Sequence, residues 1–424
     1  MVYNESKYNK NWKTMKLSDL GEFARGKSTH RPRNDKNLFE GGGYPLVQTG
    51  EIKEANLYIT HHTQEYGEFG LQQSKLWDAE TLCITIAANI AETALLAYPM
   101  CFPDSVVGFK AYKEVSSEKF MYYVFDFIRN SIQNAASGST QDNINIDYLT
   151  SLDFKVPDKI AQDKMVELLS AIDEKILMNS KINDNLEQQL TTLYDYWFTQ
   201  FDFPNENGKP YQSSGGKMVM NNCLKKKIPN GWNVESVYSN QLSSIIKPGV
   251  DKFDTKTYFA TADIKGTSLS SGTLIDYENR ENRANMQPNV NSVWFAKMKD
   301  SIKHLYLNEE MLPIISSSIL STGFCGLQCS DVSFEYMASY ISNTYFETHK
   351  DMLAHGATQE AVNNDDLAGI HIVIPDDKTL QNYHRITQPI YSQISKNICE
   401  NQELVKIRDW LLPMLMNGQA TIAD

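Results

Sequence analysis

The sequence predicts an α+β fold in which two duplicated mixed α/β domains are separated by two long helices that pair as an antiparallel coiled coil. Three observations support this prediction: an internal repeat, short strand-like runs within the repeat, and a long helical pattern after each copy of it. At 424 residues, of which 41% are hydrophobic, the chain is long enough for more than one hydrophobic core.

The repeat is clearest near the end of each copy. The segment Gly-Ser-Thr-Gln at 138–141 recurs as Gly-Ala-Thr-Gln at 356–359. The register continues without a gap to a Pro-Asp pair at 157–158 and at 375–376. Near the start of each copy, the segment at Trp12 resembles the segment at Trp232. The sequence therefore indicates a duplicated domain whose ends match and whose middles have diverged.

Short runs rich in Tyr, Val, Ile and Thr predict strands in the first copy over 45–49, 82–87 and 105–112, and residues 117–135 predict a helix. Residues 201–227 are rich in Asn, Gly, Ser and Lys and lack periodicity, which predicts a linker. The expected parts are a first domain over 1–157, a helix over 158–200, the linker, a second domain over 228–375 and a distal helix over 376–424.

Each helix carries an apolar seam whose members alternate steps of three and four residues, which is the pattern of a coiled coil. The seams run over 165–197 and 383–415. Two amphipathic helices that pack separately on their own domains would show a similar spacing. Pairing of the two helices with each other is favoured because each seam holds two asparagines at corresponding places: Asn179, Asn183, Asn397 and Asn401.

Buried asparagines fix the register between paired helices at a cost in stability. The midpoint of each seam lies between its two asparagines, so antiparallel pairing sets Asn179 against Asn401 and Asn183 against Asn397. Arg408 within the second seam and Pro413 inside the helix predict an irregular last turn.

The net charge of −12 disfavours a protein that binds DNA phosphates by itself, because such domains are usually basic. Cations nevertheless gather in one stretch of the first half and in a weaker cluster of the second. These segments are either solvated loops or phosphate contacts beside Asn and Gln that read base edges, and the repeated Gly-x-Thr-Gln loops are either capping turns or part of the DNA face. The candidate DNA-binding residues are Arg25, Lys27, Arg31, Arg33, Lys36, Ser139, Thr140, Gln141, Lys297, Lys299, Lys303, Thr358 and Gln359.

Three other site types are rejected. Residues 21–28 fit the phosphate-loop pattern G-x4-G-K-[ST], but that loop functions between a buried strand and a helix, and Pro32 follows where the helix should run. Six scattered cysteines, of which only Cys325 and Cys329 are close together, predict thiols without a metal. No nucleophile with a partnered base can be assembled, which predicts a chain without catalytic residues.

The N-terminal segment is polar and lacks an apolar signal region. The most apolar stretch, residues 81–102, contains Asn89, Glu92 and Pro99, which favours a buried core over a membrane span. These features predict a soluble cytoplasmic protein.

Taken together, these segments resemble a known family, the specificity subunits (HsdS) of type I restriction-modification systems. The resemblance covers nearly the whole chain. It rests on the opening at 12–21, the Gly-x-Thr-Gln loops followed by Pro-Asp and a long helix, the Asn-bearing helices, and the second opening at 228–232.

The resemblance implies a non-catalytic subunit with two target recognition domains, each of which reads one half of a split double-stranded DNA site, and two helical spacers that hold them apart. It further implies that two modification subunits dock on the helices and supply the S-adenosylmethionine site, that restriction subunits can join, and that this chain itself holds no cofactor. The alternative is an orphan subunit that binds modification subunits without directing modification.

Overall fold

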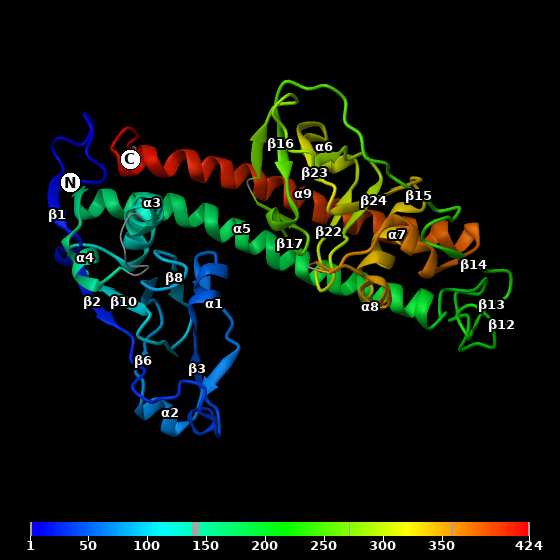
Figure 1. Cartoon of the computed structure of the whole chain (residues 1–424), viewed down its shortest axis with the longest axis horizontal. Coiled ribbons are helices and arrows are strands. Elements are labelled where there is room, and N and C mark those ends of the chain that lie inside the picture. Colours follow the sequence, from blue (N-terminus) through cyan, green and yellow to red (C-terminus); the bar gives the residue numbers. More distant parts are fainter. Residues whose placement is uncertain (1, 138–143, 271, 358, 423–424) are drawn as a thin grey trace. The chain divides into compact units, whose positions relative to one another are not determined.

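The computed structural model describes residues 2–137, 144–270, 272–357 and 359–422. The chain forms two compact units, which we call unit 1 (residues 1–177 and 404–424) and unit 2 (residues 178–403). The longest helices are α5 (Lys159–Tyr194) and α9 (Asp377–Met416), and each contributes one segment to each unit (Figure 1). None of the helices in the described ranges combines the length and the apolar character that crossing a membrane requires.

The domain of unit 1 contains two sheets and a covering helix. Its five-stranded sheet has the order β2 (Gly21–Arg25), β10 (Val106–Ala111), β7 (Leu82–Thr85), β8 (Thr93–Leu96) and β4 (Tyr58–Ile59). Its four-stranded sheet has the order β5 (Gln64–Tyr66), β3 (Tyr44–Leu46), β9 (Met100–Cys101) and β6 (Leu76–Trp77). Helix α3 (Glu118–Ser137) buries one face in the same apolar cluster as β7, β8 and β10. The strands predicted over 82–87 and 105–112 and the helix predicted over 117–135 are confirmed, whereas the strand predicted over 45–49 ends at Leu46 and a helix, α1 (Thr49–Glu54), begins at Thr49.

The domain of unit 2 also contains two main sheets. One has the order β15 (Ser243–Ile245), β24 (Phe324–Cys329), β21 (Ser292–Ala296) and β22 (His304–Leu307). The other has the order β19 (Thr273–Ile275), β16 (Lys256–Phe259), β23 (Ser318–Ser321) and β20 (Ala284–Met286). Two helices, α7 (Phe334–Ser342) and α8 (Thr344–Leu353), stand where the first domain has the single helix α3.

The two domains share one topology in every strand of these sheets except β4, which makes the sheet of the first domain five-stranded where that of the second has four strands. In the first domain β2 pairs with β10, which pairs with β7 of the β7–β8 hairpin. In the second domain β15 pairs in the same way with β24, which pairs with β21 of the β21–β22 hairpin. In the other sheet, β16 and β23 are parallel as β3 and β9 are, and the remaining corresponding pairs are antiparallel. The middles of the repeat therefore keep the same fold although their sequences have diverged, which confirms the predicted duplication of an α/β domain.

One glycine at the same place in each domain leaves room for a tryptophan ring of the core. Gly108 on β10 and Gly326 on β24 correspond in the register of the Gly-x-Thr-Gln repeat, and each lies under an indole ring. A Cβ on Gly108 would lie 2.8 Å from the ring of Trp77, and one on Gly326 would lie 2.6 Å from the ring of Trp294. The indole occupies the space of the absent side chain, although it comes from β6 in one domain and β21 in the other.

The ends of each domain are joined by a two-stranded sheet directly before the long helix. Strand β1 (Lys13–Lys16) pairs with β11 (Asp153–Val156), and β14 (Asn233–Ser236) pairs with β25 (His371–Ile374). The repeated Pro-Asp pair follows, and its carboxylate caps the helix. Asp158 accepts the backbone N–H of Ala161 at 2.8 Å, and Asp376 accepts that of Thr379 at 2.9 Å.

The segment 201–227 is not the linker that its composition predicts. Phe201 and Phe203 are buried in the core of unit 2, and the ring of Phe203 stacks on Trp232 with centroids 4.8 Å apart. Further on, β12 (Met218–Asn221) and β13 (Lys226–Pro229) form a hairpin. The prediction was wrong because a few aromatic side chains anchor the segment while polar residues cover its outer side.

The last turns of α9 are regular up to Met416, so the expected irregularity at Pro413 was wrong. Leu412, Leu415 and Met416 are buried in the apolar core of unit 1, which holds the helix in place there. At the end of the helix, the side chain of Asn4 donates to the carbonyl oxygen of Met416 at 2.6 Å. Packing and this hydrogen bond offset the loss of the proline N–H.

We expect Asp158→Ala or Asp376→Ala to lower the free energy of unfolding by about 1 kcal/mol each, because each removes a helix cap, whereas the Asn variants keep most of it. Burial alone would raise the pKa of Asp376, but hydrogen bonds from the Thr379 backbone and the Trp232 indole hold that pKa below its usual value. Its contribution is therefore present above the ordinary carboxyl pKa and is lost as the pH falls through the lowered one. Denaturant titrations at several pH values test this, and equal losses for the Ala and Asn variants would contradict it.

Candidate functional site

The centre of the helix pair lies in unit 2 and contains the four predicted asparagines. Asn179 Nδ2 donates to Asn401 Oδ1 at 2.9 Å, and Asn397 Nδ2 donates to Asn183 Oδ1 at 2.7 Å. Residue numbers rise along α5 as they fall along α9, so the helices are antiparallel. The side chains of Asn179, Asn183 and Asn397 are buried, and further bonds join Asn179 to Glu400 and Asn183 to the carbonyl of Ile394. The amides are thus satisfied in one alignment of the helices.

In unit 1 the helix pair contains a charged contact. Arg408 Nη1 lies 3.0 Å from the carboxylate of Asp173, whose side chain is only 5% exposed. The hydroxyl of Tyr123 donates to the other carboxylate oxygen of Asp173 at 2.7 Å. Burial and the Asp173 carboxylate raise the pKa of Tyr123 well above its usual value, so the hydroxyl remains a donor. Arg408 in the seam is therefore a specific partner of α5.

This charged contact has an apolar counterpart in unit 2. In the register of the repeat, Asp173 corresponds to Tyr391 and Arg408 to Leu190. Tyr391 and Leu190 are both buried in the apolar cluster of unit 2. The helix pair is therefore held by different chemistry in the two units.

The basic stretch of the first domain follows β2 and is exposed. Arg33 lies 2.5 Å and Arg31 3.6 Å from the carboxylate of Asp104, which precedes β10. Arg31 also donates to the carbonyl oxygens of Ser28 and His30 at 2.6 and 2.8 Å. The side chains of Arg31 and Arg33 keep about half of their surface in solvent, at 54% and 50%. The remaining cations of the stretch are exposed as well: Arg25, Lys27 and Lys36.

In the second domain the structure brings two predicted groups together. The lysine-bearing loop 297–303 lies against the segment 355–362, because Lys299 N–H donates to the carbonyl of Glu360 and Val362 N–H donates to that of Lys297, both at 3.0 Å. Gln359 is exposed in this segment. The amine of Lys299 is 2.5 Å from the Glu360 carboxylate, and that of Lys303 donates to the Thr261 carbonyl. The other candidates, Ser139, Thr140, Gln141 and Thr358, lie outside the described residues.

Strand pairing reveals a cation that the sequence repeat did not indicate. Phe23 on β2 pairs with Phe109, and Ile245 on β15 pairs with Leu327 at the corresponding place in the second domain. Two positions further on, Arg25 therefore corresponds to Lys247, and both are exposed. The sequences around them are too different to align by themselves, and the correspondence follows from the register of β15 against β24.

The segment that fits the phosphate-loop pattern has another structure. Residues Gly21–Arg25 form β2, which is antiparallel to β10, and Gly26 N–H donates to the carbonyl of Val106 at 2.8 Å. The next helical turn begins only at Lys36 and ends at Leu38. Along this described stretch no helix begins where the phosphate-loop pattern would place one.

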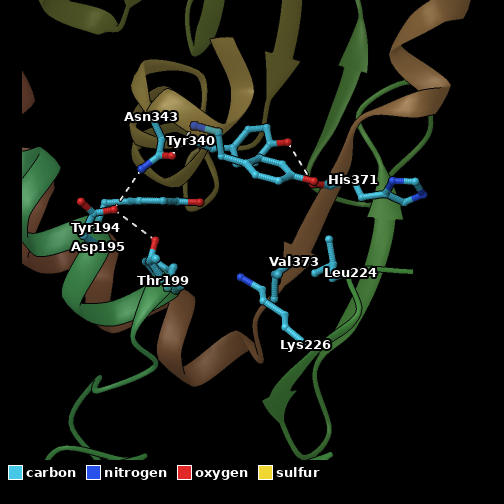
Figure 2. Close-up of a pocket in the computed structure, with 11 residues that line it drawn as sticks. Tyr194, Asp195, Thr199, Leu224, Lys226, Tyr340, Asn343, His371 and Val373 are labelled. Atoms are coloured by element: carbon cyan, nitrogen blue, oxygen red, sulfur yellow. Dashed lines mark hydrogen bonds between the residues drawn. The ribbon is translucent and has the colours of Figure 1, made fainter. Parts of the chain in front are cut away.

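Figure 2 shows a cavity of about 130 Å³ in unit 2, between the end of α5 and the second domain. Aromatic rings of Tyr194, Phe198, Tyr340 and Tyr345 line part of it. Asp195 accepts hydrogen bonds there from Thr199 at 3.1 Å and Asn343 at 3.0 Å. Burial lowers the pKa of Lys226 on its edge. The volume suits a single benzene-sized ring and is well below the roughly 300 Å³ of small cofactor pockets.

A metal site is not indicated in the part of the chain that the structure describes. No group of three or more His, Cys, Asp or Glu side chains within it could hold a metal ion. Cys325 and Cys329 both lie on β24 and are buried, and burial raises the pKa of each thiol. They stay protonated within the apolar core rather than serving as thiolate ligands.

Comparisons with known proteins identify what the chain is similar to. Residues 9–188 match the type I restriction modification DNA specificity domain. The chain is 25% identical to the type I restriction enzyme MjaIX specificity subunit of Methanocaldococcus jannaschii, over 98% of this chain and 95% of that protein. It is 21% identical to the HindI specificity subunit of Haemophilus influenzae, over 68% of this chain and 73% of that protein. The fold is similar to that of the type I restriction-modification S subunit from M. genitalium, with a TM-score of 0.52 and 14% identity over the whole of both chains.

We expect Arg408→Leu to destabilise the protein by about 3 kcal/mol, because it leaves the Asp173 carboxylate buried without a counter-ion. The double variant Asp173→Tyr with Arg408→Leu introduces the residues of the corresponding unit 2 positions and should recover most of that loss. Denaturant unfolding of the three proteins measures both effects. A loss below about 1 kcal/mol for the single variant would mean that the contact behaves as a surface ion pair.

Proposed function

We propose that this chain is a specificity subunit of a type I restriction-modification system, that its two domains each recognise one half of a bipartite DNA site and that its paired helices dock modification subunits. Members of this family are non-catalytic DNA-recognition components. The observation that carries the proposal is the duplication of the α/β domain, whose main sheets match in every strand except β4. Two copies of one fold with different surface residues suit two half-sites of different sequence.

The exposed cations support a DNA-facing side on each domain. Phosphate contacts position a protein on the duplex, and base contacts give it specificity. Arg25, Arg31 and Arg33 are exposed in the first domain, and Lys247 and Lys299 in the second. Asp104 and Glu360 neutralise part of this charge, which moderates affinity for DNA in general. For an acidic chain, contacts from partner subunits would supply the remaining attraction.

The outer faces of the helices support docking. On α5, Met178 is 56% and Ile182 39% exposed, one helical turn apart. On α9, Ile407 is 46% and Trp410 59% exposed, also about one turn apart. Apolar side chains grouped on an exposed helix face are typical of protein interfaces. In this proposal the methyl donor S-adenosylmethionine is bound by the modification subunits, and the aromatic cavity of unit 2 is too small to enclose it.

Replacing residues 20–135 with the corresponding part of a specificity subunit that has another target should change one half of the recognised site and leave the other half unchanged. The reason is that the replaced strands and loops belong to unit 1 alone. Mapping of methylated bases in host DNA, with the cognate modification subunit present, measures both half-sites. A simultaneous change in both halves would show that the domains do not recognise DNA separately.

Met178→Glu combined with Ile182→Glu should abolish co-purification with the modification subunit, since it places two charges on the proposed contact face. Gln188→Glu, an exposed change on the same helix, is the matched control and should leave the complex intact. Complex formation at the level of the unmodified chain would place the contact elsewhere. An intact complex that methylates no specific site, before any substitution, would favour the orphan function instead.

A further inference from the structure

The central hairpins of the two domains end in equivalent loops. Leu82 pairs with Leu95 in the β7–β8 hairpin, and Val293 pairs with Tyr306 in the β21–β22 hairpin. Leu82 corresponds to Val293 and Leu95 to Tyr306, with the same difference in residue number. The loops at 85–92 and 296–303 therefore have the same length and can be compared residue by residue. Charge density along the sequence singles out cations of the second loop and gives no candidate in the first.

Both loops are fastened to their domains by the same two backbone hydrogen bonds. In the first domain, Ile86 donates to the carbonyl of Ser105 at 3.0 Å and accepts from Ile144 N–H at 3.1 Å. In the second, Lys297 donates to the carbonyl of Gly323 at 2.9 Å and accepts from Val362 N–H at 3.0 Å. Each loop therefore begins between the last strand of the central sheet and the segment that follows the Gly-x-Thr-Gln residues.

A side chain from the helical layer also holds a corresponding carbonyl in each loop. Gln133 Nε2 on α3 donates to the carbonyl of Ile90 at 2.9 Å, and Lys350 Nζ on α8 donates to that of Ser301 at 3.2 Å. Lys350 is completely buried, with its amine 2.6 Å from the carboxylate of Glu347. The same point of each loop is therefore fixed from the same layer by different chemistry.

Glu347 completes a buried polar cluster beneath the second loop, because its other oxygen lies 2.8 Å from His304 Nε2. Burial alone would raise the pKa of Glu347, but His304 and Lys350 hold that pKa below its usual value. A cluster of this kind has a large desolvation cost and does not by itself indicate a gain in stability. Its geometric consequence is a fixed position for the Ser301 carbonyl.

The loops contain backbone strain that these contacts maintain. Ala88 and Ala91 have φ values of 48° and 62°, and Asp300 has a φ of 54°. Residues other than glycine in this left-handed region cost about 1 kcal/mol or more each and persist where the surroundings determine them, often at functional sites. The strained positions do not correspond, because Asp300 is equivalent to Asn89, so the two loops share their ends but differ in backbone conformation between them.

The corresponding positions of the two loops carry different side chains. Along the equal register, Ala88 corresponds to Lys299, Asn89 to Asp300 and Glu92 to Lys303. Asp300 is exposed, and Asn89 is half-buried with its side-chain oxygen 3.3 Å from the amine of Lys53, which leaves the amide NH₂ as a donor. An Asn amide can make two hydrogen bonds to adenine, and an Asp carboxylate can accept from the amino group of cytosine. Two loops that are anchored at the same points but present different polar side chains suit two recognition domains for different half-sites.

We propose that loops 85–92 and 296–303 are the base-reading elements of the two domains, with Asn89 and Asp300 contacting base edges and Gln133 and Lys350 acting as positioning residues. This inference rests on the proposed function. It assigns half-site specificity to one short loop in each domain and gives the first domain a recognition loop whose sequence contains no cation.

Exchange of the two loops within the full-length chain tests the proposal, because their equal length and their matching anchoring hydrogen bonds allow each loop to be joined at the same ends. The chain with residues 296–303 placed at 85–92 is assembled with its modification subunit, and methylated sites are mapped. The first half-site should change and the second should remain. If replacement of residues 20–135 changes the first half-site but the loop exchange does not, the loop assignment is overturned and the two-domain function stands. If neither replacement changes it, both fail.

Single substitutions test the same assignment without requiring that an exchanged loop folds correctly. Asn89→Ala should reduce discrimination between the preferred and the next base by about tenfold or more at one position of the first half-site, and Asp300→Ala should do so in the second. Asn207→Ala, an exposed change in the segment between the domains, is the control and should leave both half-sites unchanged. Unchanged discrimination in both variants would overturn the assignment.

The positioning role of Lys350 is tested by a matched pair of variants. Lys350→Met leaves Glu347 buried without its cation, whereas Lys350→Met with Glu347→Gln removes both charges. If Lys350 positions the loop, the double variant should regain thermal stability but keep a loss of selectivity confined to the second half-site. Recovery of selectivity together with stability would show that the cluster is only structural.

Discussion

The hydrogen bonds between buried asparagines of α5 and α9 are the constraint on which the rest of the structure depends. An apolar seam stabilises the association of two helices in several alignments. An amide that is buried without its partner destabilises an alignment by about the free energy of the lost hydrogen bond. Asn179 with Asn401 and Asn183 with Asn397 are satisfied in one antiparallel alignment. Each helix starts at a capping aspartate directly after its domain, so that alignment also determines which residues of each helix lie near which domain core.

Those parts of the fold that depend on periodicity and local chemistry could be predicted from the sequence. The seams, the asparagine pairing and the Pro-Asp caps all follow from spacing along one helix or from the repeat itself. The segment 201–227 could not be predicted, because its structure depends on Phe201 and Phe203, two aromatic residues that find a core contributed by distant parts of the chain. The correspondence of Arg25 with Lys247 could not be predicted either, since it follows from the register of strands rather than from similar residues.

The candidate site illustrates the same limit. Charge density along the chain identified exposed cations, but it could not show that Asp104 lies beside Arg33 or that Glu360 lies beside Lys299. Nor could it identify the loop at 85–92, which has no distinctive composition and becomes visible only when its hairpin is compared with the one at 296–303. Apart from the corresponding pair Arg25 and Lys247, the two domains therefore carry their candidate cations on different loops of the same fold.

In a chain with two similar halves, each long helix could pair with the wrong partner. For example, α5 of one molecule could align with α5 of another through the same apolar seam. The ion pair between Asp173 and Arg408 opposes this error. In an antiparallel pair of two α5 helices, Asp173 would face Leu190, and in a pair of two α9 helices, Arg408 would face Tyr391. Either arrangement buries a charge beside an uncharged side chain, whereas α5 with α9 joins the two charges. This charged contact, which breaks the symmetry of the repeat, thus favours pairing of α5 with α9 over pairing of either helix with a copy of itself.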